Sequence, residues 1–286
     1  MKKILVLTDF SKKSEHAAEF ALAIAAKVNA EVTLHNAFYV PSLVPVDPAM
    51  YSYYDDYAES GKENMDELNQ LAERLKKKYV KLNGSNPPPI TLKNCLGLLK
   101  ETIEETAGKN KFWLIVMGDQ CKEGAISRFM FGSNTYSVID RVSCPVLLVP
   151  EKAVQKPFRK IVFAASLRQA EHKAVSFLKK FGDFYESEIS VIHVTEEKPS
   201  VEEKVKNYDA YSRLNSGVDY PNIYYRDIAG KDIVKTISSL AGKEGPDLLV
   251  VQHKQRSVIG KLFHTSITKE LMEFHRVPLL VVPSKS

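Results

Sequence analysis

An internal repeat constrains this fold more than any other feature of the sequence. Residues 114–150, LIVMGDQCKEGAISRFMFGSNTYSVIDRVSCPVLLVP, have a second copy at 248–283, LLVVQHKQRSVIGKLFHTSITKELMEFHRVPLLVVP. Each copy runs from a short apolar segment through a polar loop into a helical pattern, and then through a proline into a second apolar segment. The start of the chain recurs after Pro157 as well, where Glu171-His172 is expected to match Glu15-His16, so the sequence predicts a tandem duplication.

The order of the predicted elements indicates the fold class. Residues 4–7, 12–28 and 32–35 read as strand, amphipathic helix and strand, and short apolar runs bounded by Gly or Pro are typical of buried parallel strands. Each half continues this alternation, as β-α-β-α-β-α-β-α-β. The prediction is therefore two tandem doubly wound, Rossmann-like α/β domains, residues 1–150 and 151–286, each with a five-stranded, mainly parallel sheet flanked by helices.

The middle of the first half is longer than that of the second. The excess lies largely in residues 41–65, which are rich in proline and tyrosine. This composition predicts a long loop before a helix at residues 65–82, and such loops usually have a use in compact domains. Three interpretations stay open, namely a lid over a site, a partner surface, and an ordered insertion packed on its own aromatic side chains.

Composition and charge exclude several classes of protein. With 286 residues, 44% of them hydrophobic, the chain can bury two ordinary cores, and no apolar run approaches the ~18 residues of a membrane span. Residues 4–7 are too short for a signal-peptide core, so we expect a cytoplasmic protein that does not associate with membranes. The excess of five positive charges is dispersed over residues 151–286, which favours a solvated face over nucleic-acid binding.

Motifs for catalysis and for metal binding are missing from the sequence. It contains no G-x-x-x-x-G-K-[ST], no G-x-S-x-G and no H-E-x-x-H. His35 and His193, at matching strand ends, are predicted to be hydrogen-bonded core or rim residues rather than ligands. Three cysteines form no C-x-x-C pair, so we expect reduced thiols. Cys121 is also a candidate redox sensor, because a thiol in a loop rich in N–H groups can have a lowered pKa.

A group of polar and glycine residues marks a candidate site. If the strands are parallel, these residues lie at the carboxyl edge of one sheet, where helix N-termini and backbone N–H groups favour phosphate. Gly132 and Ser133 would form an anion nest at a helix start. The group consists of Thr8 and Asp9, Asn36, Gly118, and Gly132 with Ser133.

These residues resemble the universal stress protein family. The family's strand opening stands here as Thr8-Asp9-Phe10-Ser11. Its nucleotide-binding loop, G-x2-G-x9-G-[S/T], is matched here from Gly118 to Ser133. Cys121 stands at the position of the second glycine, and ten residues instead of nine separate it from Gly132. The resemblance implies an adenine nucleotide alpha hydrolase-like fold and an ATP or AMP ligand, with Mg²⁺ if ATP and no intrinsic metal. It implies contacts to the nucleoside from Asp9 and Asn36, with Thr8 beside them, and to ribose and phosphates from Gly118, Cys121, Gly132, Ser133 and Asn134.

The second repeat departs further from the family pattern. Its loop has Gln252, Gln255 and Thr265-Ser266 in place of the glycines, and Ser166 in place of Asp9. We therefore predict a degenerate copy that is structural or binds a partner. The resemblance also implies that the last strands, residues 146–149 and 279–282, pair in an intrachain pseudo-dimer, and it allows a homodimer.

Three functions remain open at this point. The first is a stress-response protein that binds an adenine nucleotide, ATP above all, in the N-terminal domain alone. The second is a regulatory or scaffold member of the family that binds no nucleotide and acts through protein partners. The third is a slow ATP hydrolase, for which Asp9 is the candidate general base.

Overall fold

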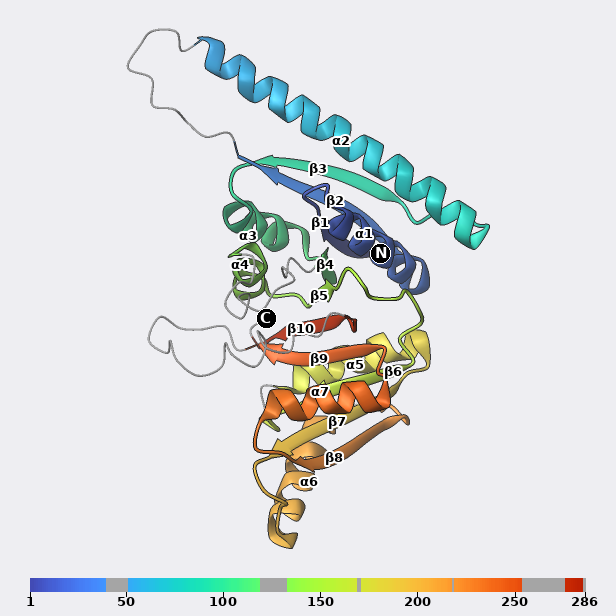
Figure 1. Cartoon of the computed structure of the whole chain (residues 1–286), viewed down its shortest axis with the longest axis vertical. Coiled ribbons are helices and arrows are strands. Elements are labelled where there is room, and N and C mark those ends of the chain that lie inside the picture. The colour runs from blue at the N-terminus through green and yellow to red at the C-terminus, as the bar shows by residue number, and fades with distance from the viewer. Residues whose placement is uncertain (40–50, 119–132, 169–170, 218, 254–275, 285–286) are drawn as a thin grey trace. The chain divides into compact units, whose positions relative to one another are not determined.

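The chain forms two compact α/β units in the computed structural model, which describes residues 1–39, 51–118, 133–168, 171–217, 219–253 and 276–284. Of these, unit 1 holds residues 1–118 and 133–144, and unit 2 holds residues 145–284. Strands and helices alternate along residues 2–141 and again along residues 160–253 (Figure 1). The prediction of two doubly wound α/β repeats is therefore confirmed.

Unit 1 is built on four parallel strands in the order β3-β2-β1-β4. Crossover connections between parallel strands are right-handed, so the connections from β1 to β2 and from β2 to β3 lie on one face of the sheet. The connection from β3 to β4 runs in the opposite direction along the sheet and therefore lies on the other face. The elements are β1 (Lys2–Leu7), α1 (Lys12–Val28), β2 (Ala30–Phe38), α2 (Tyr51–Asn83), β3 (Ile90–Leu96), α3 (Leu99–Asn110), β4 (Leu114–Gly118) and α4 (Ser133–Arg141).

Helix α1 shows how local sequence defines one of these elements. Ser11 caps its start by accepting a hydrogen bond from the Ser14 amide, and Asn29 ends it in the left-handed conformation. Its alanine-rich inner face is buried, with Ala17, Ala21 and other small side chains fully covered by the sheet. Small residues allow the helix to approach the strands closely, and its N-terminus lies at the carboxyl edge of the sheet because the helix follows directly after β1.

Helix α2 corrects the prediction of a long loop over residues 41–65. The helix begins at Tyr51, so residues 51–65 belong to it, while residues 41–50 lie outside the described part of the chain. Its early turns dock on the sheet, because Asn94 on β3 donates a hydrogen bond from Nδ2 to the Gly61 carbonyl at 2.8 Å. Gly61 also lies close to the Phe38 ring. This part of the insertion is therefore an ordered extension of the helix.

Unit 2 has six strands in the order β5-β10-β9-β6-β7-β8. They are parallel except for β5, which pairs antiparallel with β10 through Val146 opposite Val281 and Leu148 opposite Leu279. The expected pairing of the two last strands is thus observed. The elements are β5 (Val146–Val149), β6 (Lys160–Ala164), α5 (His172–Tyr185), β7 (Glu188–Thr195), α6 (Val201–Asn215), β8 (Ile223–Ala229), α7 (Ile233–Glu244), β9 (Leu248–His253) and β10 (Leu279–Pro283).

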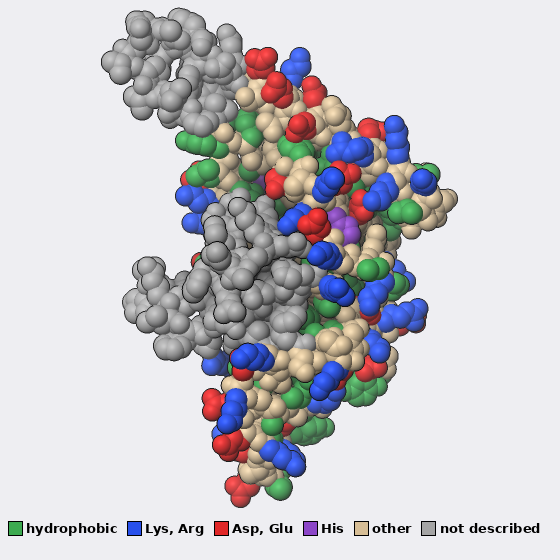
Figure 2. Space-filling model, viewed as in Figure 1, with side chains coloured by type: hydrophobic (Ala, Val, Ile, Leu, Met, Phe, Trp, Pro, Cys, Tyr) green, Lys and Arg blue, Asp and Glu red, His purple; other side chains and the backbone are tan. Residues whose placement is uncertain are grey.

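The surface carries both signs of charge close together. On the face shown in Figure 2, Lys and Arg side chains are interspersed with Asp and Glu side chains over the described residues. Ion pairs join several charged side chains of the described residues, such as Arg74 with Glu15 and Arg226 with Glu244. Within the described ranges, no helix is both long and apolar enough to cross a membrane.

Candidate functional site

Unit 1 has a pocket at the point where the order of its strands reverses. The chain moves from β1 outward to β3 and then returns to β4 on the other side of β1, so the crevice between the ends of β1 and β4 is the topological switch point. A cavity of about 80 Å³ lies there. We call it the switch-point pocket, and it is lined by Leu7, Thr8, Asp9, Ser11, Lys13, Ser14, His35, Ala37, Leu99, Met117 and Gly118.

The turn after β1 is held in an uncommon conformation. Phe10 has φ 62°, in the left-handed region that non-glycine residues rarely adopt. Thr8 stabilises the turn, because its Oγ1 accepts a hydrogen bond from the Phe10 amide at 3.0 Å and lies 3.0 Å from Ser14 Oγ. Strain of this kind persists only where surrounding contacts impose it, and it is concentrated at binding sites.

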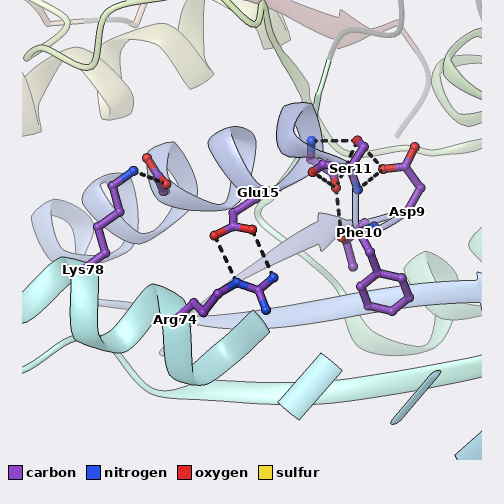
Figure 3. A network of polar contacts seen from close by, with 9 residues as sticks. Asp9, Phe10, Ser11, Glu15, Arg74 and Lys78 are labelled. Carbon is purple, nitrogen blue, oxygen red and sulfur yellow. Dashed lines mark hydrogen bonds and ion pairs between the residues drawn. The ribbon is translucent and has the colours of Figure 1, made fainter. Parts of the chain in front are cut away.

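Asp9 follows β1 on the exposed side of this turn (Figure 3). Its Oδ1 accepts hydrogen bonds from Ser11 Oγ at 2.6 Å and from the Ser11 amide at 3.1 Å. Partial burial raises the pKa of Asp9, but the hydrogen bonds from Ser11 and Ser14 outweigh it and lower the pKa below its usual value. The site therefore presents an ionised carboxylate, which can only accept hydrogen bonds.

Gly118 lies against the backbone of α1. A Cβ at this position would be 2.7 Å from the Lys13 carbonyl oxygen and 3.1 Å from the Ser14 nitrogen. Both distances are shorter than van der Waals contact. The structure thus gives Gly118 a packing role, since a side chain here would push the first turn of α1 away from β4.

His35 and Asn36 place buried polar groups behind the turn. Asn36 Nδ2 donates to the Thr8 carbonyl oxygen at 2.9 Å, but its Oδ1 has no hydrogen-bond partner in the described structure, and neither has either ring nitrogen of His35. Burial, with a smaller effect of the Lys93 charge, lowers the pKa of His35 to about 4. The prediction that His35 is buried is confirmed, but the prediction that it is hydrogen-bonded is wrong.

The predicted site residues fall into three groups. Thr8, Asp9 and Gly118 line the switch-point pocket, and Asn36 is buried beside it. Ser133 and Asn134 open α4, but their side chains, like all of Cys121 and Gly132, lie outside the described residues. The other lining residues were not predicted as site residues, namely Leu7, Ser11, Lys13, Ser14, His35, Ala37, Leu99 and Met117. Of these, only Ser14 could have been predicted from the sequence, because a serine three residues after the Ser11 cap is close enough to form hydrogen bonds within the turn.

The equivalent turn of unit 2 is built differently. Leu167 has φ 58°, so the left-handed residue recurs, but here the turn surrounds the carboxylate of Glu171. Glu171 Oε1 accepts from the Ser166 amide at 2.9 Å and from Ser166 Oγ at 2.8 Å, while Oε2 accepts from the Arg168 amide at 3.2 Å. Glu171 is only 4% exposed. The candidate carboxylate of unit 1 is therefore exposed, and that of unit 2 is buried.

Strand register gives the correct correspondence between the repeats. Leu7 pairs with His35, and Ala164 pairs with Ile192, so His35 matches Ile192 and not His193. His193 matches Asn36, and each of these two side chains bonds the first carbonyl after the first strand. When this alignment is continued past the first strand, Glu171 stands at the position of Ser14 and His172 at that of Glu15. The expected match of Glu171-His172 to Glu15-His16 is therefore wrong. His193 is hydrogen-bonded, as predicted.

Cysteines and metal ligands add nothing to the site in the described residues. Cys95 and Cys144 are free thiols, and burial raises the pKa of Cys144 to about 12, so this thiol is not activated. Cys121, the redox candidate, lies outside the described residues. Among the residues that the structure describes, no three His, Cys, Asp or Glu side chains form a group able to hold a metal ion.

The fold and the pocket define a protein of two tandem doubly wound α/β repeats with a polar pocket at one switch point. The profile of the Universal stress protein family matches residues 1–150 and again 157–283, and the chain belongs to this family. A universal stress protein of Methanocaldococcus jannaschii is 32% identical over 153 residues, which are 52% of this chain and 81% of that protein.

Solved structures show the same two-domain fold. A universal stress protein from Archaeoglobus fulgidus is similar with a TM-score of 0.73 and 17% identity, over 99% of this chain and 98% of that chain. A functionally unknown protein from Pseudomonas aeruginosa is similar with a TM-score of 0.61 and 13% identity, over 99% of this chain and 92% of that chain. At these identities, the likeness concerns the fold alone.

Proposed function

We propose that this protein is a regulatory universal stress protein that binds one adenine nucleotide per chain, in the switch-point pocket of unit 1. The observation that carries the proposal is the exposed, ionised carboxylate of Asp9 at the topological switch point. Open α/β sheets bind their ligands at this place. The matching turn of unit 2 offers no such group, because its carboxylate is buried.

The chemistry around Asp9 favours a ligand with hydroxyl groups next to an anion. A carboxylate that only accepts hydrogen bonds suits the hydroxyls of a ribose and repels a phosphate. The phosphates would instead lie toward α4, whose first turn has no acidic residue and whose N-terminus carries the positive end of the helix dipole. A nucleotide has both features in one molecule.

Hydrophobic side chains complete the pocket. Leu7, Leu99 and Met117 line it beside the polar turn, so apolar surface for a base lies next to a few polar groups. Asp9 is the carboxylate among the described lining residues. A Mg²⁺ ion would therefore be bound mainly by the phosphates of ATP, which is how this ion usually enters nucleotide sites.

Mass spectrometry of the small molecules released when the purified protein is denatured tests this function. We expect an adenine nucleotide in the wild-type protein and a much smaller amount in an Asp9→Ala variant. As a control, Glu31→Ala changes a carboxylate that pairs with Lys3, away from the pocket. If the wild-type protein releases no adenine nucleotide and binds none at millimolar concentration, the proposal is wrong.

A second candidate function, binding of a protein partner, is favoured by one surface of unit 2. Val201, Val205 and Tyr208 on α6 are 78%, 57% and 58% exposed. Their spacing places them on one side of the helix, as in amphipathic helices that dock on another surface. Replacing Val205 with Lys should abolish binding of such a partner and leave nucleotide binding unchanged.

A further inference from the structure

We infer that Glu171 is an internal anion that occupies the β6–α5 turn of unit 2 and keeps external anions from this turn, whereas the matching turn of unit 1 stays open to a ligand. The part of the inference that concerns unit 1 rests on the proposed function. The part that concerns the turn of unit 2 rests on its geometry alone. The residue therefore determines which of the two matching turns is open to a ligand.

The contacts of Glu171 are those of a bound anion. Two backbone amides and one hydroxyl, from Ser166 and Arg168, donate to its two carboxylate oxygens at 2.8–3.2 Å. Backbone N–H groups that converge around a left-handed residue, here Leu167, are a common anion-binding arrangement. The carboxylate of Glu171 fills this arrangement from inside the protein, where it is 4% exposed.

The carboxylate of the turn stands at different aligned positions in the two repeats. In unit 1, Asp9 supplies it from the exposed side, and the small Ser14 lies on the inner side of the turn. In unit 2, Glu171 supplies it from the position of Ser14, and Ser166 stands at the position of Asp9. The serine and the carboxylate therefore stand at exchanged positions in the two turns.

This exchange has two consequences for a ligand at unit 2. The hydroxyl of Ser166 already donates to Glu171, so the exposed side of the turn has lost the ionised acceptor that Asp9 provides in unit 1. The amides of Ser166 and Arg168 are also committed to the internal carboxylate. A phosphate or another anion from solution would have to displace a buried group that is tethered to the same turn, which is unfavourable.

The first test replaces Glu171 in the full-length chain and uses inorganic phosphate and acetate as probes. In Glu171→Ala, amide exchange at Ser166 and Arg168 should accelerate about tenfold or more, because both donors lose their acceptor. Millimolar phosphate or acetate should then shift the NMR signals of these two amides in a saturable way, with no such response in the wild type. Glu171→Gln, which keeps an acceptor oxygen, should retain most of the protection and show little response.

The second test gives the turn of unit 1 the two residues that stand at the same positions in unit 2. In Asp9→Ser combined with Ser14→Glu, ATP affinity should fall at least about tenfold, while the unfolding midpoint stays close to that of the wild type because the new side chain supplies a carboxylate to the turn. In Asp9→Ser alone, both affinity and stability should fall. Tight ATP binding by the folded double variant would contradict the inference.

The outcomes separate the inference from the proposed function. If wild-type protein binds no nucleotide, the proposed function fails, and the phosphate titration of Glu171→Ala still decides whether the turn is an anion site. The inference about Glu171 is wrong if hydrogen exchange at the amides of Ser166 and Arg168 stays as slow in folded Glu171→Ala as in the wild type. It is also wrong if the NMR signals of these amides do not shift when phosphate or acetate is added.

Discussion

Replacing Gly118 with Ala tests whether α1 rests on the end of β4 as the structure describes. The added Cβ would lie 2.7 Å from the Lys13 carbonyl oxygen and 2.8 Å from its carbon, both of them backbone atoms. The first turn of α1 would have to retreat by roughly 0.5–1 Å to restore contact distances. Overpacking of this kind costs about 1–3 kcal/mol, or about 2–4 °C in Tm per kcal/mol for a unit of this size.

Urea unfolding followed by circular dichroism measures this change, with Gly108→Ala as the matched control. Gly108 lies within α3 and a Cβ there meets nothing within 4 Å, so alanine should stabilise that helix by roughly 0.5–1 kcal/mol. The pair should therefore change the free energy of unfolding in opposite directions. Equal stability of Gly118→Ala and the wild type would refute the packing argument.

Two further predictions concern buried groups of unit 1. His35 has a folded-state pKa of about 4 against an ordinary 6.5, so the unfolded chain binds more protons between these values. The stability that neutral His35 contributes is present above about pH 6.5 and is lost as pH falls toward 4, by about 2 kcal/mol at pH 5. His35→Leu should remove this loss in urea titrations at pH 5 and 7.5, whereas the exposed control His172→Gln should keep it. Asn94→Ala removes the hydrogen bond to Gly61, so hydrogen exchange should accelerate in residues 59–65 of α2, and unchanged exchange there would show that this contact does not hold the helix.

Periodic patterns were sufficient to predict most of the elements. Helix α1 has the predicted bounds, and the alternation of strands and helices is confirmed through α7. The start of α2 could not be predicted in the same way, because the prolines near residue 41 suggested a loop through residue 65. Proline affects the backbone only locally, and the helix begins three residues after Pro48.

The site could be predicted in part. Thr8, Asp9 and Gly118 were identified because loops at the carboxyl edge of a parallel sheet converge. Matching identical letters in the two repeats assigned Glu171 to the wrong position, since the alignment of the repeats by strand register makes it equivalent to Ser14. The buried, unpaired ring of His35 depends on tertiary packing that no local pattern encodes.

Isothermal titration of the full-length chain with ATP tests the central claim most directly. One nucleotide should bind per chain, and Asp9→Ala should weaken this binding strongly, because among the described residues only unit 1 presents an exposed carboxylate at its switch-point turn. Ser166→Ala, at the matching position of unit 2, should leave it unchanged, since that hydroxyl is held by Glu171. Two equivalents of ATP per chain, or equal affinity in wild type and Asp9→Ala, would contradict the account.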